Sequence, residues 1–506
     1  MNHLIILPIM LPALIAPILV MAARHDLVLA RVLSVAAAVL MLVLAVMLLV
    51  SASGQPPQMY ALGDWPAPFG IVLVLDRLSA LMLVLTALLS LAVLIYALGG
   101  WDGRGRHFHA LWQFQLMGIN GAFLTGDFFN LFVFFEVLLI ASYGLMVHGG
   151  GAARMRAGVQ YVVVNLVGSS LFLIAVGMIY SVTGTLNMAD LAARVPEVAD
   201  ADRAILHTGA LLLLMVFGIK AALVPLHFWL PGTYGHASAP VAALFAIMTK
   251  VGAYSIIRLF PLAFGAGAGI SADLAAPWLL PAALISLALG MVGVLAARQL
   301  TQLVSFAVIG SMGTLLTAVA LSSPQSMGAA LYYLLHSTLA AAVLFLIAGE
   351  VGARRGGADR LAPGPVFGGR GLLSGFFFVA AIAMCGMPPL SGFVGKLLIL
   401  DSARGAANAV LIWSVVLGSS LLCIIGFSRA GSTLFWKTAA AGKDEIAPPP
   451  RTSVLPLVSI GSLLAALLVL TALAGPLTGW LDVTAAQIYQ PEQYVDAVLG
   501  EAGGRE

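Results

Sequence analysis

The sequence predicts an all-α polytopic membrane protein of about fourteen transmembrane helices, and three observations indicate this fold class. Hydrophobic residues make up 61% of the 506 residues and charged residues only 9%, whereas soluble domains carry about 25% charged residues. The mean hydropathy is +1.05. Apolar stretches of about 20 residues, long enough to cross the hydrocarbon core as helices, recur from residue 4 to residue 474. We therefore expect a single transmembrane domain over residues 1–506, without a sizeable soluble domain.

Glycine and proline clusters and charged loops divide the apolar sequence into fourteen predicted spans. These spans cover residues 4–23, 28–50, 71–97, 108–125, 128–147, 159–181, 206–230, 238–261, 277–297, 301–321, 328–349, 372–402, 408–428 and 454–474. The first range lacks the basic start and the small-residue cleavage site of a signal peptide, so we interpret it as a retained helix. A short amphipathic tail is expected at about 482–500.

Basic residues alternate between successive loops as the positive-inside rule requires. Of the 24 Lys and Arg residues, fifteen lie in alternate loops, four lie on the opposite side and five lie in or at the ends of spans. An even number of spans then predicts both termini on the outer face of a bacterial cytoplasmic membrane. The formal net charge of +3 is small, and the basic residues lack interleaved aromatics, so the sequence does not favour nucleic-acid binding.

Two predicted spans contain helix-breaking residues beside a buried lysine. The seventh span has Pro225 in mid-membrane, shortly after Lys220, and such a proline removes a backbone hydrogen bond. The twelfth span contains the run Cys385-Gly-Met-Pro-Pro-Leu-Ser-Gly-Phe-Val-Gly-Lys396. Broken helices at matching places in two halves indicate an inverted-repeat transporter with a site at the membrane midplane. The alternative is that the prolines only kink the two helices.

Glu136 is the only acidic residue deep inside a predicted span. A charge at the centre of a membrane helix costs roughly 2.5–3.5 kcal/mol on insertion scales, so such residues usually face the bundle interior and serve ion pathways. An isolated carboxyl there would be neutral unless a cation such as Lys220 approached it. A carboxyl whose ionisation depends on a lysine can transfer protons. A static buried ion pair is the alternative.

Lys250 and His336 lie in the middle of two further spans. Lys250 is too deep for its stem to reach either surface easily, and buried lysines can exchange protons. A structural lysine bound to carbonyls freed by a broken neighbouring helix is the alternative. His336 could relay protons between the lysines, since imidazole titrates near neutral pH, or it could be a hydrogen-bonded packing residue.

The remaining histidines and the cysteines carry weaker signals. His227 and His236 flank the loop after the broken seventh span, where they could form a cytoplasmic proton entry. Their spacing across a Pro-Gly turn is not a metal motif, and we expect neither a metal site nor a haem. Cys385 and Cys423 lie in separate apolar runs, so we expect neither a disulfide framework nor a cluster site. We expect no cofactor, and the sequence does not locate a Na+ site.

Several motifs in order resemble the antiporter-like subunits shared by respiratory complex I and the multisubunit Mrp cation/proton antiporters. They are Asn130-Leu-Phe-Val-Phe-Phe-Glu136, Lys220 with Val224-Pro-Leu-His-Phe-Trp-Leu-Pro231, His236-Ala-Ser-Ala-Pro240, Lys250-Val-Gly-Ala-Tyr254 and Gly386-Met-Pro-Pro-Leu-Ser-Gly-Phe-Val-Gly-Lys396. The resemblance covers nearly the whole chain. It implies two inverted five-helix repeats, spans 4 to 8 over residues 108–261 and spans 9 to 13 over residues 277–428, before a short tail at 482–506.

The resemblance also implies roles for the buried residues. Protons would move laterally through Glu136, Lys220, Lys250, His336 and Lys396. In the family, the glutamate and the lysine of the broken seventh helix form a pair whose separation gates proton movement. The lysine of the eighth span connects this pair to the second half, and the twelfth-span residue ends the path.

Within the family, the details are most similar to the D subunits of Mrp antiporters. Lys396 disfavours the M type of complex I, which usually has glutamate there, and the sequence lacks the long lateral helix of the L type and the extra membrane region of the Mrp A subunit. One departure is Ala340, where several complex I relatives have a lysine. This leaves His336 as the one titratable group of that span and makes the connection from Lys250 to Lys396 the weakest part of the path.

The resemblance implies a secondary transporter subunit rather than an enzyme. It would exchange protons for Na+ or another monovalent cation, in a membrane hetero-oligomer with the A, B, C, E, F and G subunits of an Mrp complex. The alternative is a proton-pumping subunit of the M or N type in respiratory complex I or a membrane-bound hydrogenase. A scaffold with a vestigial polar core is a third interpretation, and four costly buried charges beside two helix breaks argue against it.

Overall fold

The computed structural model describes residues 3–23, 25–357, 359–364, 366–437 and 453–500. Across these residues the chain forms a helical bundle in which 11 helices are long and apolar enough to cross a membrane. Two shorter apolar helices, Leu7–Met21 and Arg370–Cys385, accompany them. The prediction of an all-α membrane fold is confirmed.

The elements follow one another along the chain in four groups. The N-terminal group is α1 (Leu7–Met21), α2 (Leu27–Gly54), β1 (Gln58–Ala61), β2 (Val72–Leu75) and α3 (Arg77–Ala97). The next group is α4 (Phe108–Leu124), α5 (Phe128–Met146), α6 (Ala152–Thr183), α7 (Met188–Arg194), α8 (Arg203–Lys220), α9 (Trp229–His236) and α10 (Ala239–Ala263). The third is α11 (Ala276–Ala296), α12 (Leu300–Ala320), α13 (Pro324–Arg354), α14 (Arg370–Cys385), α15 (Ser391–Ser402) and α16 (Ala409–Gly431). The last is α17 (Leu455–Ala472), α18 (Ala474–Ile488) and α19 (Pro491–Leu499).

Each predicted span contains one helix, except that the twelfth contains the two half-helices α14 and α15 and the seventh contains α8 and only the start of α9. The seventh is interrupted between α8 and α9 and the twelfth between α14 and α15. The number of membrane crossings and the inverted repeats stay predictions.

Two predicted span starts were wrong by more than five residues, and one of them is α6, which starts at Ala152 and not at residue 159. The span expected to start at residue 71 starts only at Arg77, because β2 forms first and pairs antiparallel with β1. The Asp76 side chain accepts a hydrogen bond from the Ser79 backbone and caps α3 there. The tail expected at about 482–500 falls on the second half of α18, which starts at Ala474, and on α19. Residues 501–506 of that tail lie outside the described residues.

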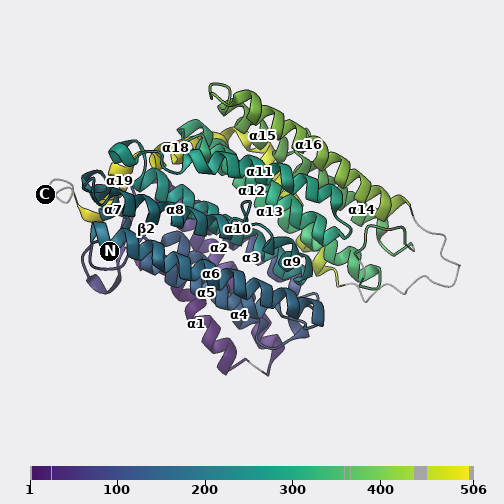
Figure 1. The fold of residues 1–506 in the computed structure, drawn as a ribbon. Coiled ribbons are helices and arrows are strands. Elements are labelled where there is room, and N and C mark those ends of the chain that lie inside the picture. The colour runs from purple at the N-terminus through teal and green to yellow at the C-terminus, as the bar shows by residue number, and fades with distance from the viewer. Residues whose placement is uncertain (1–2, 24, 358, 365, 438–452, 501–506) are drawn as a thin grey trace.

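The bundle has α10 and α3 between two sets of helices. In Figure 1, α1, α4, α5 and α6 lie below this centre, and α11 to α16 lie above it. The most apolar windows of α10 and α13 are 100% buried, and these two helices pack against each other. The two helices that carry Lys250 and His336 are therefore enclosed by protein.

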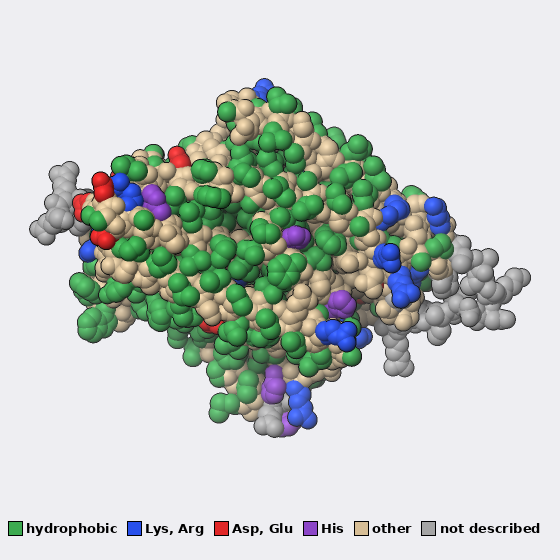
Figure 2. All heavy atoms as spheres, viewed as in Figure 1, with side chains coloured by type: hydrophobic (Ala, Val, Ile, Leu, Met, Phe, Trp, Pro, Cys, Tyr) green, Lys and Arg blue, Asp and Glu red, His purple; other side chains and the backbone are tan. Residues whose placement is uncertain are grey.

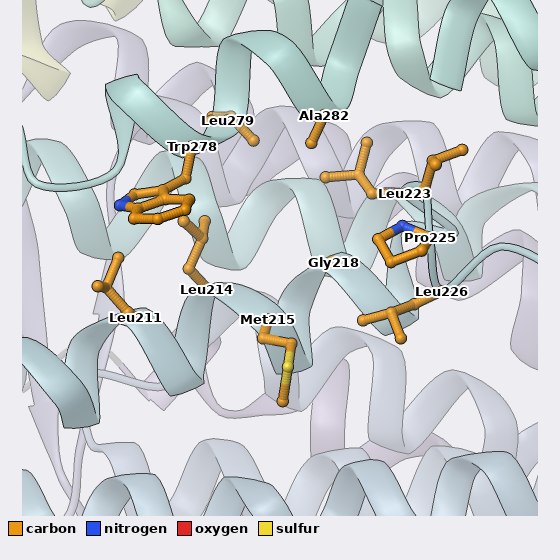
Figure 3. Close-up of a pocket in the computed structure, with 11 residues that line it drawn as sticks. Leu211, Leu214, Met215, Gly218, Leu223, Pro225, Leu226, Trp278, Leu279 and Ala282 are labelled. Carbon is orange, nitrogen blue, oxygen red and sulfur yellow. The ribbon is translucent and has the colours of Figure 1, made fainter. Parts of the chain in front are cut away.

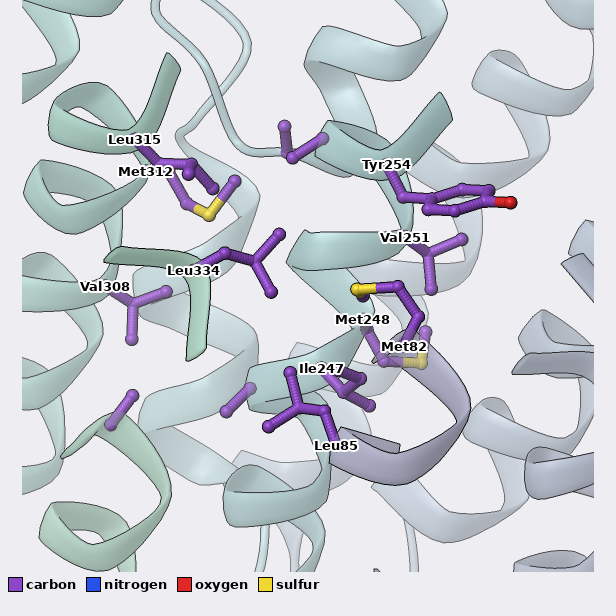
Figure 4. Packing of buried hydrophobic residues seen from close by; sticks show 14 of the residues in the cluster. Met82, Leu85, Ile247, Met248, Val251, Tyr254, Val308, Met312, Leu315 and Leu334 are labelled. Carbon is purple, nitrogen blue, oxygen red and sulfur yellow. The ribbon is translucent and has the colours of Figure 1, made fainter. Parts of the chain in front are cut away.

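Apolar side chains fill the space around α10. Figure 4 shows Met82 of α3 and Met248 of α10 side by side, with Leu334 of α13 and Met312 of α12 nearby. These residues belong to one continuous buried cluster. Because interiors of this kind are close-packed, the polar groups of α10 lie in surroundings that offer few hydrogen-bond partners.

The two ends of the bundle differ in charge. The first and last described residues, the β-hairpin, α7 and α19 lie at the left end (Figure 1). Figure 2 shows that Lys and Arg side chains gather mainly at the right and lower edges of this face and most visible acidic side chains at the left, across a broad hydrophobic belt. At the left end, Arg77 lies 4.4 Å from the ring of Trp480 and ties α3 to α18.

Candidate functional site

The first helix break follows Lys220, the last residue of α8. The Leu223 backbone donates to the Gly218 carbonyl at 2.9 Å, and Ala222 between them has φ +55°. This is the left-handed turn that commonly ends helices. The indole of Trp229, which starts α9, donates to the Ile219 carbonyl at 3.0 Å. The last turn of α8 is therefore satisfied inside the protein, and Lys220 stays at a fixed helix end.

Glu136 and Lys220 lie at one site, but each binds a neutral side chain. Lys220 Nζ donates to Asn165 Oδ1 at 2.8 Å, and Ser169 Oγ donates to Glu136 Oε1. No ion pair within 4.0 Å joins Glu136 to Lys220 in the described structure. Both neutral partners come from α6. The structure therefore holds the predicted pair in a separated arrangement.

Aromatic rings line this site. Lys220 Nζ lies 5.8 Å from the ring centroid of Phe135. Phe172 of α6 makes edge-to-face contacts with Phe135 at 5.6 Å and with Phe217 at 5.7 Å. These ring contacts pack α5, α6 and α8 against one another. The few polar groups that lie among the rings are the groups at this site that can exchange protons.

Lys250 lies on α10, the helix that packs against the end of α8, and its amine has no hydrogen-bond partner among the described atoms. The Lys250 side chain is completely buried. A Cβ added at Gly252 would lie 2.7 Å from both Ala221 N and Phe217 O, so α10 approaches the end of α8 backbone to backbone. The alternative of a lysine bound to freed carbonyls finds no support, because no such bond joins Nζ to any described carbonyl.

The second break separates α14 from α15 and binds a lysine differently. Gly386 has φ +76°, and the Met387 backbone donates to the Ile382 carbonyl at 3.1 Å. Lys396 of α15 reaches back across the break, where Nζ donates to the Cys385 carbonyl at 2.8 Å and to Ser420 Oγ at 2.8 Å. The carbonyl freed at the end of α14 thus binds the amine.

His336 contacts the start of the same half-helix. Its Nδ1 lies 2.9 Å from Ser391 Oγ, and its Nε2 has no partner among the described atoms. A Cβ at Gly392 would lie 2.8 Å from Nε2, so this nitrogen faces the first turn of α15. The structure therefore places His336 of α13 against α15, the short helix that carries Lys396. Helix α13 also packs against α10, which carries Lys250.

The two cysteines, which lie in separate apolar runs of the sequence, meet beside Lys396. Cys385 Sγ and Cys423 Sγ are 3.4 Å apart, and both are free and buried. A disulfide bond is about 2.05 Å long, so these are thiols in contact. The contact arises because α14 and α16 pack side by side at this point.

His227 and His236 were expected to flank a loop, but the segment between them is helix α9, which ends at His236. His227 lies within the break, half-buried, whereas His236 is the exposed last residue of α9. His236 borders a depression of about 640 Å³ that Arg154, Ser238 and Asp359 also line. The buried Ser238 Oγ has no partner among the described atoms. Of the two histidines, His236 thus lies at the exposed end of the bundle and His227 further inside it.

An apolar cavity of about 370 Å³ lies between α8 and α11 beside the first break. Figure 3 shows Leu214 and Met215 of α8 facing Trp278 and Ala282 of α11, with Pro225 at one end. Hard cations bind oxygen ligands, which these walls do not offer. This cavity is therefore not a cation site.

Asn165, Ser169, Ser391 and Ser420 are site residues that sequence reasoning missed. Neutral polar side chains are common in membrane helices, so none stands out as a charge does. The one available signal was the spacing of Asn165 and Ser169, since residues four apart lie on one helix face. In the described part of the chain, no group of three or more His, Cys, Asp or Glu residues could hold a metal ion.

Comparisons with known proteins show what the whole chain is similar to. The family described as NADH:quinone oxidoreductase/Mrp antiporter, TM, matches residues 125–423. The chain is 39% identical to a Rhizobium meliloti protein named as the D subunit of a probable K(+)/H(+) antiporter, over 99% of this chain and 98% of the relative. It is 38% identical to the D subunit of the Bacillus subtilis Na(+)/H(+) antiporter, over 99% of this chain and 100% of the relative. Among solved structures, a chain of the Mrp complex from a Dietzia species is similar with a TM-score of 0.89 and 28% identity, over 99% of this chain and 100% of that chain.

Proposed function

Because this chain belongs to the NADH:quinone oxidoreductase/Mrp antiporter transmembrane family, we propose that it is the D subunit of a multisubunit antiporter that exchanges protons for a monovalent cation. It is a transporter subunit and not an enzyme. The relatives are named for K+ and for Na+, and both ions are substrates to test. The A, B, C, E, F and G subunits of such a complex are the proposed partners in a bacterial cytoplasmic membrane, with both termini of this chain on the outer face.

The observation that carries the proposal is the separated arrangement of Glu136 and Lys220. Lys220 is buried and Glu136 is half-buried among apolar side chains, where charges are costly, and each is held by a hydrogen bond to a neutral residue of α6. Movement of Lys220 toward Glu136 would favour the ionised carboxylate, and its return would favour the protonated one. The pair can therefore take up and release a proton as the lysine moves.

The remaining residues of the proposed proton path lie on α10, α13 and α15. Lys250 has an amine without a described partner and lies on the helix that packs against the end of α8, so it is the proposed next acceptor of the proton. His336 bonds to α15 through one nitrogen and has no described partner at the other, so it can connect Lys250 to Lys396. The depression beside His236 and Arg154 is the proposed cytoplasmic entry, and His227 lies further along the same broken span.

The test is cation-dependent proton exchange in everted membrane vesicles of an antiporter-deficient strain that carries the complete operon. Glu136→Ala and Lys220→Ala are each expected to abolish exchange with both Na+ and K+ while the complex stays assembled on a native gel. An assembled Glu136→Ala complex that exchanges at the wild-type rate would remove this chain from the proton path. Growth of the strain in high salt without this gene would contradict the antiporter assignment.

A further inference from the structure

Helix α6 presents two polar side chains to the Glu136 and Lys220 site from an otherwise apolar span. Asn165 and Ser169 are four residues apart, so they lie one above the other on a single face. They are 1% and 7% exposed. The outer face of the same helix carries exposed apolar residues such as Val163 and Leu166. Helix α6 thus separates an apolar outer surface from a polar inner contact.

Both members of the charged pair are bound by this one helix. Lys220 Nζ donates to Asn165 Oδ1 at 2.8 Å, and Ser169 Oγ donates to Glu136 Oε1. The Asn165 amide cannot turn freely, because its Nδ2 donates to the Tyr161 carbonyl at 2.8 Å. This bond fixes the amide oxygen toward Lys220. Each charged group therefore has a preformed neutral partner.

These contacts compete with direct pairing of the two charges. Opposite charges in an apolar interior attract strongly and pair unless other polar groups satisfy them. A hydrogen bond to a charged group shifts an equilibrium by about tenfold to a hundredfold. Removal of either neutral partner therefore shifts the pair toward the closed arrangement by a factor of this size.

We propose that Asn165 and Ser169 are positioning residues that hold Lys220 and Glu136 apart, and that α6 thereby sets how long the pair stays open. This inference rests on the proposed function, since the open fraction matters only if the pair carries protons. Neither residue exchanges a proton itself. Their contribution is to keep Lys220 available to Lys250, whose helix touches the end of α8.

The experiment compares Asn165→Leu and Ser169→Ala with the wild type in the complete complex, in everted vesicles. Leucine is close to asparagine in size, so Asn165→Leu removes the acceptor with little change in packing. The maximal exchange rate is expected to fall about tenfold to a hundredfold for each, while the cation concentration for half-maximal exchange stays unchanged. Ser169→Thr retains the hydroxyl and is expected to keep most of the rate.

Ser170→Ala is the matched control, because Ser170 is the next residue and its Oγ bonds to the Leu166 carbonyl of its own helix. This variant is expected to exchange at the wild-type rate. Wild-type rates for both Asn165→Leu and Ser169→Ala would overturn the inference, and so would equal losses in Ser169→Ala and Ser169→Thr or in Ser170→Ala. A wild-type rate in Glu136→Ala would instead overturn the proposed function, so the two failures are distinguishable.

Discussion

The two helix breaks differ in which half-helix carries the lysine and in which group binds it. At the first break, Lys220 ends the half-helix before the gap and bonds to the side-chain amide of Asn165. At the second, Lys396 lies on the half-helix after the gap and folds back to the Cys385 carbonyl and Ser420 Oγ. The first break therefore uses side chains from a neighbouring helix, and the second uses the backbone group that the break itself frees.

The first site also has a carboxylate, whereas the contacts of the second site are neutral. Glu136 is held one helix turn from the Asn165 contact, so a small movement of Lys220 changes the charge balance there. Lys396 is bound by a carbonyl and a hydroxyl, and its titratable neighbours include the two thiols and His336. Breaks of similar construction can therefore serve as a gate in one half of the chain and as a terminus in the other.

After the abolished exchange expected for Glu136→Ala and Lys220→Ala, the largest loss of transport should come from the lysine of the second break. Lys396→Ala removes the amine there and is expected to lower the exchange rate at least tenfold, because the proposed lateral path would lose its last residue. Exchange in everted vesicles is measured against complex quantified on a native gel. Lys437→Ala, which changes an exposed lysine beyond α16, is the control. A wild-type rate for an assembled Lys396→Ala complex would leave the first break as the whole proton path.

The second-largest loss of exchange is expected from oxidation of the thiol pair beside Lys396. Copper phenanthroline should oxidise Cys385 and Cys423 to a disulfide, with two protons lost and two electrons passed to the oxidant. The bond would fix α14 to α16 at the contacts of Lys396, and exchange should fall in proportion to the thiols consumed. Thiol tagging of the denatured chain counts them. Cys423→Ser is the control, since its exchange should resist the oxidant, and loss of exchange there would disconnect the effect from this pair.

The third-largest effect is expected from substitutions of Gly386 and Ala222, the residues with positive φ at the two breaks. A Cβ at Gly386 would lie 2.6 Å from Lys396 Cδ, and a left-handed conformation costs an L residue about 1–2 kcal/mol. Gly386→Ala is therefore expected to destabilise the complex by about 1–2 kcal/mol and to lower exchange severalfold. Ala222→Gly relieves the corresponding conformation at the first break and should raise the melting temperature slightly. Equal behaviour of the two variants would show that the breaks are built alike.

The weakest effect on transport lies outside both breaks. Burial alone would raise the pKa of Asp102, but hydrogen bonds from His109 and Arg31 outweigh it and lower that pKa to about 2. Because the folded-state pKa is depressed, this stabilisation is present above the unfolded value and is lost only as the pH falls from about 4 toward 2. Asp102→Asn should cost about 1–3 kcal/mol of stability and leave the pH profile of exchange in the neutral and mildly alkaline range unchanged. A shifted profile would mean that protons reach this loop during transport.

The sequence was sufficient for the positions of the spans and for both breaks, because apolar length and paired prolines are local signals. It was not sufficient for the segment 72–75, since four apolar residues fit a buried strand as well as a helix. The Asp76 cap with Ser79 was the overlooked sign that α3 starts later. Charged residues such as Glu136 and Lys396 could be selected because their burial is costly.

The partners of these charges could not be selected in the same way. Asn165, Ser169 and Ser420 cost little inside a membrane helix, so their roles depend on which helices pack together. The contact between Cys385 and Cys423 likewise exists only because α14 and α16 meet. The separated state of Glu136 and Lys220 is a property of this packing and has no sequence signature.

The complete enclosure of α10 has a consequence for how fast this helix can be reached by water. Its most apolar window is fully buried, so its amide hydrogens exchange with solvent only when the surrounding helices part. In deuterated buffer, the amides of α10 would thus record the lifetime of the whole bundle.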